Sequence, residues 1–258
     1  MAEGRQIPHH SEAIVLRCWP FHEADLLVSL FTREQGKVKG VARHAMKSRK
    51  RFGGALEPAT YVRAHYTERP RVELVRLDSF EILWSPMSAP ITVERLAGVQ
   101  LVTEVLEEAM PEGALEDNIF RLAMACLTAM DAHEVWLPVT YFCVWMSRLM
   151  GWWPDLGHCA VCGLDLHGQD VWWSPVADGV TCSDDRRSQS ARLRATSIEE
   201  GRRLLRSSLE ALLVQPWPKG KADDLRQFAV GVLERHLERR LRSAAALAGA
   251  ARDSAATV

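Results

Sequence analysis

The chain lacks the apolar segments that would place it in or across a membrane. No uninterrupted apolar run approaches the ~18 residues that a membrane-spanning helix needs. The first residues, MAEGRQIPHHSEA, contain no apolar stretch of signal-peptide length. These absences predict a soluble, cytoplasmic protein with no membrane partner.

Sequence signatures of three common enzyme classes are also missing. The chain has no G-x-x-x-x-G-K-[ST] loop for nucleotide phosphates, no G-x-S-x-G elbow and no H-E-x-x-H helix. No internal repeat is visible. Nucleotide hydrolysis, a hydrolase elbow and a zincin site therefore have no support in the sequence.

What is present is enough for a folded core with an uneven charge. The 258 residues are 47% apolar and carry a net charge of -1, which suffices for one large or two smaller domains. Residues 1–84 hold 14 Lys or Arg against 10 acids, whereas residues 85–258 hold 18 against 23. This asymmetry predicts that the first part meets a polyanion and that the rest meets something else.

Residues 1–84 contain five strand-like segments and almost no helical periodicity. The first of them places Ile14, Leu16 and Cys18 on one face. Five strands in this span predict a compact antiparallel barrel, an architecture that often binds nucleic acid. The segments are Glu12–Trp19, Asp25–Thr32, Lys37–His44, Thr60–Thr67 and Arg71–Glu81.

From residue 85 onward apolar residues recur every three or four positions, which predicts an α-helical domain over 85–258. Ser197 and Glu200 have capping-box spacing at the start of the fourth helix. A segment rich in Gly, Trp and Cys, at about 151–190, has no helical period and is expected to be an insertion. The helices are predicted at 91–110, 115–130, 138–150, from about 197 until Pro216 ends the element, and 223–247.

The second and third strands form a hairpin with a strongly basic continuation, called here the basic hairpin (residues 25–54). Alternation turns Lys37 and Lys39, with Arg43, to one face, away from Val38 and Gly40. A solvated charged face is the alternative to a phosphate-binding stripe. The barrel setting favours nucleic-acid binding by the eight cations of residues 33–51, a span whose one acid is Glu34. These cations are Arg33, Lys37, Lys39, Arg43, Lys47, Arg49, Lys50 and Arg51.

Six cysteines fall into two sets. Cys18, Cys126 and Cys143 are scattered along the chain, and in a reducing compartment we interpret them as small buried hydrophobes. The other three lie in the insertion and need a separate explanation.

The grouped cysteines have the spacing of a zinc site. Cys159 and Cys162 form a C-x-x-C knuckle, nineteen residues precede Cys182, and Asp185 stands where a fourth cysteine would complete the pattern. We predict structural Zn²⁺ on these four residues, because zinc accepts carboxylate oxygen as well as thiolate. A metal-free knuckle and a redox pair are the alternatives, and His158, His167 and Asp184 are reserve ligands.

Two tryptophan pairs flank the cysteine cluster, Trp152 with Trp153 and Trp172 with Trp173. Stacking on nucleic-acid bases is one use of such side chains. Packing is favoured, since so small a module needs apolar cover.

Together these features resemble the RecO family of bacterial DNA-repair proteins. The resemblance rests on HEADLLVSLFTREQGKVKGVARHAMKSRKRFGGALEP, residues 22–58, and on the order of strands, helices, a C-x-x-C-G knuckle and a helical end. One departure is that the second cysteine pair ends in Asp185, which leaves metal ligation incomplete by the family pattern.

The resemblance implies an α+β multidomain fold with an N-terminal five-stranded OB-fold barrel, an α-helical domain and a zinc-ribbon-like insertion. It implies a non-catalytic recombination mediator in DNA-damage repair, located with the bacterial nucleoid. Such a protein binds single- and double-stranded DNA, associates with RecR, contacts single-strand-binding protein, helps load RecA and anneals complementary strands. The acidic, apolar-ended tail of single-strand-binding protein is expected on the helices, with Trp145–Leu149 and Arg202–Arg206 as candidate contacts.

Two other functions stay open. A metal-dependent nuclease would draw on His22, Glu23 and Asp25. A protein-interaction scaffold would carry the basic loop incidentally and would not be retained by DNA or heparin.

Overall fold

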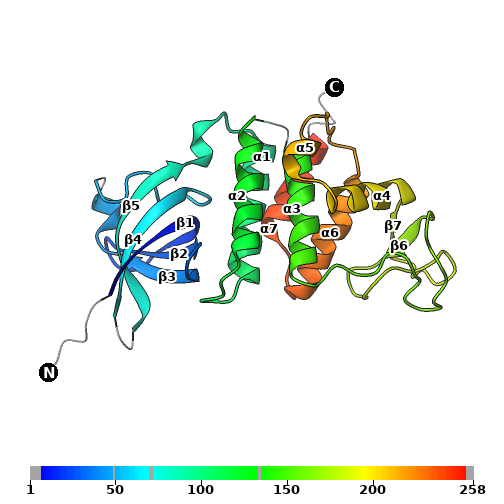
Figure 1. Ribbon diagram of the computed structural model, residues 1–258, viewed down its shortest axis with the longest axis horizontal. Helices are drawn as coiled ribbons and strands as arrows, with labels where there is room; N and C mark the ends of the chain where they lie inside the picture. The colour runs from blue at the N-terminus through cyan, green and yellow to red at the C-terminus, as the bar shows by residue number, and fades with distance from the viewer. Residues whose placement is uncertain (1–6, 49, 70–71, 133–134, 254–258) are drawn as a thin grey trace. The chain divides into compact units, whose positions relative to one another are not determined.

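A computed structural model describes residues 7–48, 50–69, 72–132 and 135–253 (Figure 1). It forms two compact units, Met1–Asp131 and Ala132–Val258. The first holds the barrel together with the first two long helices, so the division at residues 84 and 85 remains a prediction. None of the helices within the described ranges is long and apolar enough to cross a bilayer.

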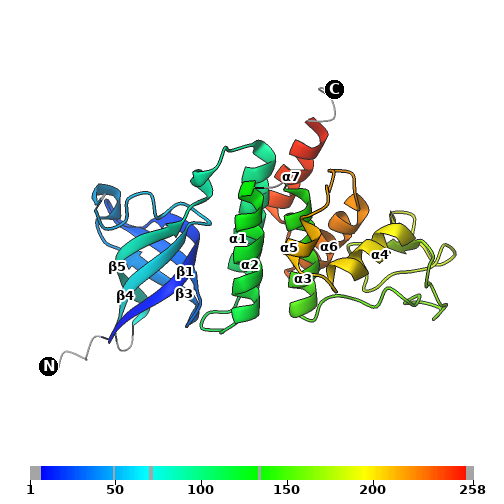
Figure 2. The same ribbon diagram turned by 45° about the horizontal axis from the view of Figure 1, so that its top comes forward.

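The predicted five-stranded barrel is confirmed. The barrel is seen from two sides in Figure 1 and Figure 2. It closes in the order β1-β2-β3-β5-β4, which is the OB-fold. Every pair is antiparallel except β3 with β5, which run parallel with Gly40 opposite Val75. The expectation of a wholly antiparallel barrel was wrong because an odd number of strands cannot alternate direction all the way round a closed ring. The strands are β1 Ile7–Pro20, β2 Leu26–Thr32, β3 Gly36–Ala42, β4 Tyr61–Arg69 and β5 Val72–Trp84.

A β-bulge changes which side chains of β1 face the barrel core. The register with β2 shifts between Val15 and Arg17, so Ala13 and Val15 lie in the core before the bulge and Cys18 packs against it afterwards. The predicted common face of Ile14, Leu16 and Cys18 is therefore wrong. Ile14 and Leu16 are nevertheless buried.

Two helices pack on the outside of the barrel: α1 Val93–Ala109 and α2 Asp117–Ala132. Thr92 caps α1, its hydroxyl accepting from the Arg95 amide at 3.1 Å. Phe120 of α2 places its ring 5.8 Å from that of Phe31 and 6.2 Å from that of Tyr61, both on the barrel. The helices thus cover part of the outer face of the barrel, which explains why β1 and β2 are buried on both faces. Two short 3₁₀ turns, η1 Ala45–Lys47 and η2 Pro86–Ser88, complete the first unit.

The second unit is helical around the predicted insertion. Its helices are α3 Trp136–Leu149, α4 Ala195–Leu204, α5 Leu209–Leu212, α6 Asp223–His236 and α7 Arg242–Asp253, and its only described strands are β6 Val171–Trp173 and β7 Ala191–Leu193. The helix predicted at 223–247 is two helices. Glu238 takes a left-handed φ of 54°, and the Glu234 carboxylate accepts from the Leu241 amide at 2.9 Å, which ends one helix and starts the next.

The capping box predicted at Ser197 does not form. The residue before α4 is Arg194, and Ser197 lies inside the first turn. The Ser197 hydroxyl instead donates to the Asp224 carboxylate at 2.6 Å. A partner distant in sequence therefore replaced the local cap.

Candidate nucleic-acid interface and metal centre

The cations of the basic hairpin divide into two groups in the structure. On the outer face of β3, Lys37 is only 9% exposed, and its ammonium donates to the Glu107 carbonyl at 2.6 Å. Lys39 pairs with Glu112 at 2.7 Å. Arg33 pairs with Asp117 at 2.9 Å and with Glu12 at 3.2 Å. The predicted alternation is confirmed for Lys37 and Lys39, but Arg43 lies in the turn after β3, which ends at Ala42. Lys37, Lys39 and Arg33 already meet acceptors of their own unit.

The remaining cations surround η1 and are called here the loop cations: Arg43, Lys47, Lys50 and Arg51. The first three are exposed. Arg51 is half-buried; its guanidinium donates to the Arg43 carbonyl and to the Ser48 hydroxyl, and lies 5.2 Å from the Phe52 ring centroid. Arg49 lies outside the described residues. The loop cations present positive charge to solvent, which makes them the better placed group for phosphate contacts.

The carboxylate of Asp25 holds this loop in place. It accepts from the His44 amide at 2.7 Å, and His44 has a left-handed φ of 54°. The Met46 amide donates to the Ala24 carbonyl at 3.2 Å. Asp25 thus has a structural role in this loop, and this contact does not support the nuclease alternative.

The four residues predicted to bind zinc meet in space. The sulfur atoms of Cys159, Cys162 and Cys182 and a carboxylate oxygen of Asp185 all lie within 4.8 Å of one another. The Asp185 oxygen is 3.2 Å from the sulfur atoms of both Cys159 and Cys182, and the sulfur atoms of Cys162 and Cys182 are 3.9 Å apart. Around tetrahedral zinc, bonds of about 2.3 Å to sulfur and 2.0 Å to oxygen leave ligand atoms roughly 3.5 to 3.8 Å apart. The donor set and its spacing fit a small tetrahedral metal ion.

Backbone contacts explain how a separation of nineteen residues is closed. The Ala160 amide donates to the Val180 carbonyl at 2.8 Å, and the Gly163 amide to the Cys159 carbonyl at 2.9 Å. Gly163 has a φ of 74°, a conformation that side-chain-bearing residues rarely adopt. The C-x-x-C-G turn therefore directs both sulfur atoms toward the second loop.

Protonation within the cluster reflects the close approach of its donors. Hydrogen bonds from Cys162, Cys182 and Cys159 lower the pKa of Asp185. The Asp185 carboxylate, in turn, is the main cause that raises the pKa of Cys162 to about 12. A bound cation would reverse the second effect by stabilising the thiolates, so metal binding must release protons from this site.

Three of the four tryptophans that flank the cluster pack as predicted, whereas the half-buried Trp172 carries Arg186 over its ring at 5.6 Å. Trp153 and Trp173 meet the ring of Phe228 on α6 edge to face, at 5.5 and 5.3 Å between centroids. Trp152 stacks on His236 at 5.0 Å. These contacts join the insertion to the helices of the second unit.

The scattered cysteines are inert hydrophobes, as expected. Cys126 and Cys143 are fully buried, and burial raises the pKa of Cys143 and that of the partly exposed Cys18 to about 12. At neutral pH both stay thiols, the poorly nucleophilic form.

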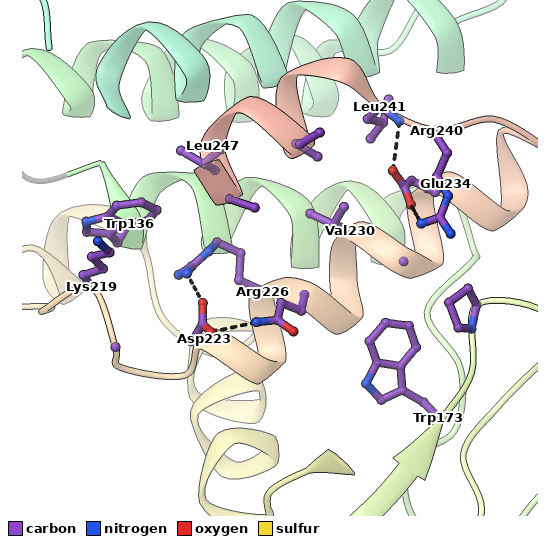
Figure 3. A pocket seen from close by; sticks show the side chains of 17 residues that line it. Trp136, Trp173, Lys219, Asp223, Arg226, Val230, Glu234, Arg240, Leu241 and Leu247 are labelled. Atoms are coloured by element: carbon purple, nitrogen blue, oxygen red, sulfur yellow. Dashed lines mark hydrogen bonds and ion pairs between the residues drawn. The ribbon is translucent and has the colours of Figure 1, made fainter. Parts of the chain in front are cut away.

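Sequence reasoning missed a cavity of about 740 Å³ in the second unit (Figure 3). Arg226 enters it from α6, pairs with Asp223 and lies 4.7 Å from the Trp136 ring centroid. It is 5% exposed, and among the described residues its buried Nη1 has no hydrogen-bond partner. Lys219 stands 5.7 Å from the same ring. The only signal for Arg226 in the sequence was a cation close to Leu225 and Phe228 in a predicted helix.

Two family models match successive parts of the chain. One, described as the N terminal part of recombination protein O, matches residues 7–86, and the other, the C terminal part, matches residues 92–245. The chain belongs to the RecO family. The resemblance drawn from residues 22–58 is confirmed.

Curated RecO relatives agree over most of their lengths. The chain is 48% identical to DNA repair protein RecO of Koribacter versatilis over 90% of this chain and 94% of that protein. It is 31% identical to the protein of the same name from Syntrophobacter fumaroxidans, over 76% of this chain and 77% of that protein. It is also 31% identical to that of Anaeromyxobacter sp. strain K, over 88% of this chain and 91% of that protein. RecO membership supports a role in DNA repair.

Proposed function

We propose that this RecO-family chain is a non-catalytic recombination mediator that binds single- and double-stranded DNA through the loop cations. Working with RecR and single-strand-binding protein in the cytoplasm, at the nucleoid, it would load RecA and anneal complementary strands. The observation that carries the proposal is the group of exposed loop cations, Arg43, Lys47 and Lys50, at one end of an OB barrel. Contacts with phosphates position a protein without reading bases, so binding should be largely indifferent to sequence.

Salt dependence of DNA binding tests this proposal. Each cation that neutralises a phosphate adds roughly 0.7 to 0.9 to the slope of log affinity against log salt. The variant Arg43→Gln, Lys47→Gln, Lys50→Gln should therefore flatten the slope by about 2 to 3. The matched control Arg121→Gln, Arg187→Gln, Arg206→Gln removes three exposed charges elsewhere and should leave the slope within about 1 of the parent value.

Three outcomes are informative. An unchanged slope in the loop variant would move the DNA site away from η1. Equal losses in loop and control variants would indicate a diffuse charge effect. No retention of the parent protein on heparin, and no gel shift with DNA, would favour the scaffold alternative. Strand annealing with and without RecR then tests the mediator role.

The cluster of Cys159, Cys162, Cys182 and Asp185 would hold structural Zn²⁺ in this proposal. Three thiolates and a carboxylate match the ligand preferences of zinc, and four protein ligands are the number that structural zinc sites use. Metal analysis of protein purified without added zinc should give about one Zn²⁺ per chain, and the pair Cys159→Ser, Cys162→Ser should lose it. Substoichiometric zinc that these substitutions leave unchanged would mean that the knuckle is metal-free.

The tail of single-strand-binding protein would enter the cavity beside Arg226. Lys219, Arg226 and Arg240 outnumber Asp223 and Glu234 among its charged lining residues by one, which suits an anionic ligand. The apolar wall of Leu241 and Leu247 suits an apolar terminal residue. The two segments predicted from the sequence, Trp145–Leu149 and Arg202–Arg206, are each partly buried. The Trp145 indole donates to the Leu204 carbonyl at 3.0 Å. Arg202 borders a smaller cavity of about 280 Å³.

A cavity-filling substitution separates these two places. Ala248 is exposed and lines the larger cavity, so Ala248→Trp should weaken binding of a fluorescent tail peptide at least tenfold. Ala246→Trp, at an exposed α7 position that does not line it, is the control. If Arg202→Ala weakens peptide binding while Ala248→Trp does not, the smaller cavity is the receptor.

A further inference from the structure

The connection between α1 and α2 is strongly acidic and lies against the basic hairpin. From Glu107 to Asp117 it carries five acids and no Lys or Arg; this segment is called here the acidic connection. Its backbone is attached to β3, since the Gly113 amide donates to the Lys37 carbonyl at 3.1 Å. A Cβ built on Gly36 would lie 2.1 Å from the Ala114 carbonyl oxygen, so only glycine allows the hairpin turn to approach so closely.

This attachment aligns acids with the cations of the hairpin. The carboxylate of Glu112 is 2.7 Å from the Lys39 ammonium, and that of Asp117 is 2.9 Å from Arg33. Glu107 accepts from the Ser29 hydroxyl at 2.5 Å through its carboxylate, and from Lys37 through its carbonyl. The hydrogen bond from Lys39 lowers the pKa of Glu112, consistent with a formed ion pair.

The two ion pairs are exposed enough to exchange. Lys39 and Glu112 expose 33% and 59% of their side chains, and Arg33 and Asp117 expose 44% and 52%. Pairs of this kind are weak and screened by salt, whereas DNA offers a dense row of phosphates. Lys37 differs, because it is buried and donates to the Glu107 carbonyl. A phosphate could take the place of this acceptor only if the buried ammonium left its site, which costs free energy.

We propose that the acidic connection is an autoinhibitory partner of the DNA-binding barrel. In the free protein Glu112 occupies Lys39, and Asp117 together with Glu12 occupies Arg33. DNA must therefore displace these three carboxylates before both cations contact phosphate. The loop cations would bind first and the two guarded cations afterwards, only on DNA long enough to reach both groups. This inference rests on the proposed DNA binding.

The test measures the DNA affinity of the full chain after Glu112 and Asp117 are neutralised; this double substitution is called here the guard variant. Glu112→Gln with Asp117→Asn should bind a single-stranded 30-mer about three- to tenfold more tightly at low salt, with a salt slope steeper by about 1 to 2. Glu116→Gln removes a charge from the same connection but keeps both ion pairs, and should change affinity less than about twofold. Adding Arg33→Gln and Lys39→Gln to the guard variant should abolish the gain.

Equal affinities for the guard variant and Glu116→Gln would overturn the autoinhibitory contact, as would a gain that survives removal of Arg33 and Lys39. Failure of the proposed function looks different, because the parent protein itself would then not be retained by DNA at low salt. Thermal unfolding of each variant shows whether the barrel is intact, and a variant with only Asp117→Asn provides the same test if the double variant does not fold.

Discussion

The Arg194 guanidinium and the Asp224 carboxylate form a two-pronged ion pair that joins the end of the insertion to the start of α6. The Nε of Arg194 lies 2.9 Å, and its Nη2 2.8 Å, from the two carboxylate oxygens, and the Arg194 amide donates to the same carboxylate at 2.8 Å. Ser197 adds a fourth hydrogen bond. One carboxylate thus orients β7, the first turn of α4 and the N-terminus of α6, where its charge also suits the helix dipole.

Asp224→Asn should destabilise the second unit in a pH-dependent way. Burial opposes ionisation of Asp224, but hydrogen bonds from Arg194 and Ser197 outweigh it and lower the pKa from 3.8 to about 2. Because the folded pKa is the lower one, the stabilisation is complete above about pH 4 and is lost as the pH falls through 2. After allowance for partial solvent screening it amounts to about 1 to 2 kcal/mol.

Urea unfolding at pH 5 to 7 should show this deficit at a constant size, and it should shrink only below pH 4. Glu210→Gln, at an exposed position of α5, is the control and should change stability by less than about 0.5 kcal/mol. A deficit that already vanishes at pH 5 would contradict the low pKa.

Gly231→Ala should weaken the contact between the insertion and α6. A Cβ at this position would lie 2.5 Å from the Trp173 ring, which must then shift away from Phe228. Overpacking of this kind costs about 1 to 3 kcal/mol, against a helix-propensity gain of up to about 1 kcal/mol from Gly to Ala. Gly249→Ala, where a Cβ meets nothing within 4 Å, should not destabilise α7. Equal stability of the two variants in thermal unfolding would show that Trp173 moves freely.

Gly36→Ala should loosen the acidic connection from the barrel. Gly36 has a φ of 67°, and its added Cβ would overlap the Ala114 carbonyl. We expect a loss of about 2 kcal/mol or more in stability, measured by denaturant unfolding. Gly113→Ala is a matched control, with a φ of 73° but open space around its Cβ, so it should cost only the backbone strain. A larger loss at Gly113 than at Gly36 would contradict the close approach.

Chelation should lower the stability of the second unit if the cluster holds metal. Removing the ion leaves three thiols and a carboxylate without their common partner, and structural zinc contributes folding free energy directly. Tryptophan fluorescence should change because Trp153 and Trp173 connect the insertion to Phe228. The change should reverse on adding Zn²⁺. It should occur at a lower chelator concentration as the pH falls, because protons compete with the metal ion for the thiolates. An unaltered melting curve in excess chelator would argue against structural metal.

Local pattern was sufficient for much of the fold. Alternation identified the five strands, and apolar periodicity located the helices, because both reflect which side of an element faces the core. The spacing of Cys159, Cys162 and Cys182, with Asp185 after them, was enough to predict that four potential ligands share one site. Their meeting depends on a local C-x-x-C-G turn and on the backbone hydrogen bond from Ala160 to Val180, which holds the second loop beside that turn.

Contacts between residues distant in sequence decided the rest. The hairpin sequence marked Lys37 and Lys39 as outward cations but contained nothing about the acids, some seventy residues later, that meet them. Ser197 had the spacing of a helix cap, yet Asp224 offered its hydroxyl a charged acceptor. The sequence by itself therefore determined the five barrel strands, most of the helices, the metal-ligand pattern and the family. Only the tertiary structure decided which of these cations form ion pairs and which stay exposed to solvent, because an ion pair forms with whichever opposite charge the fold brings within reach.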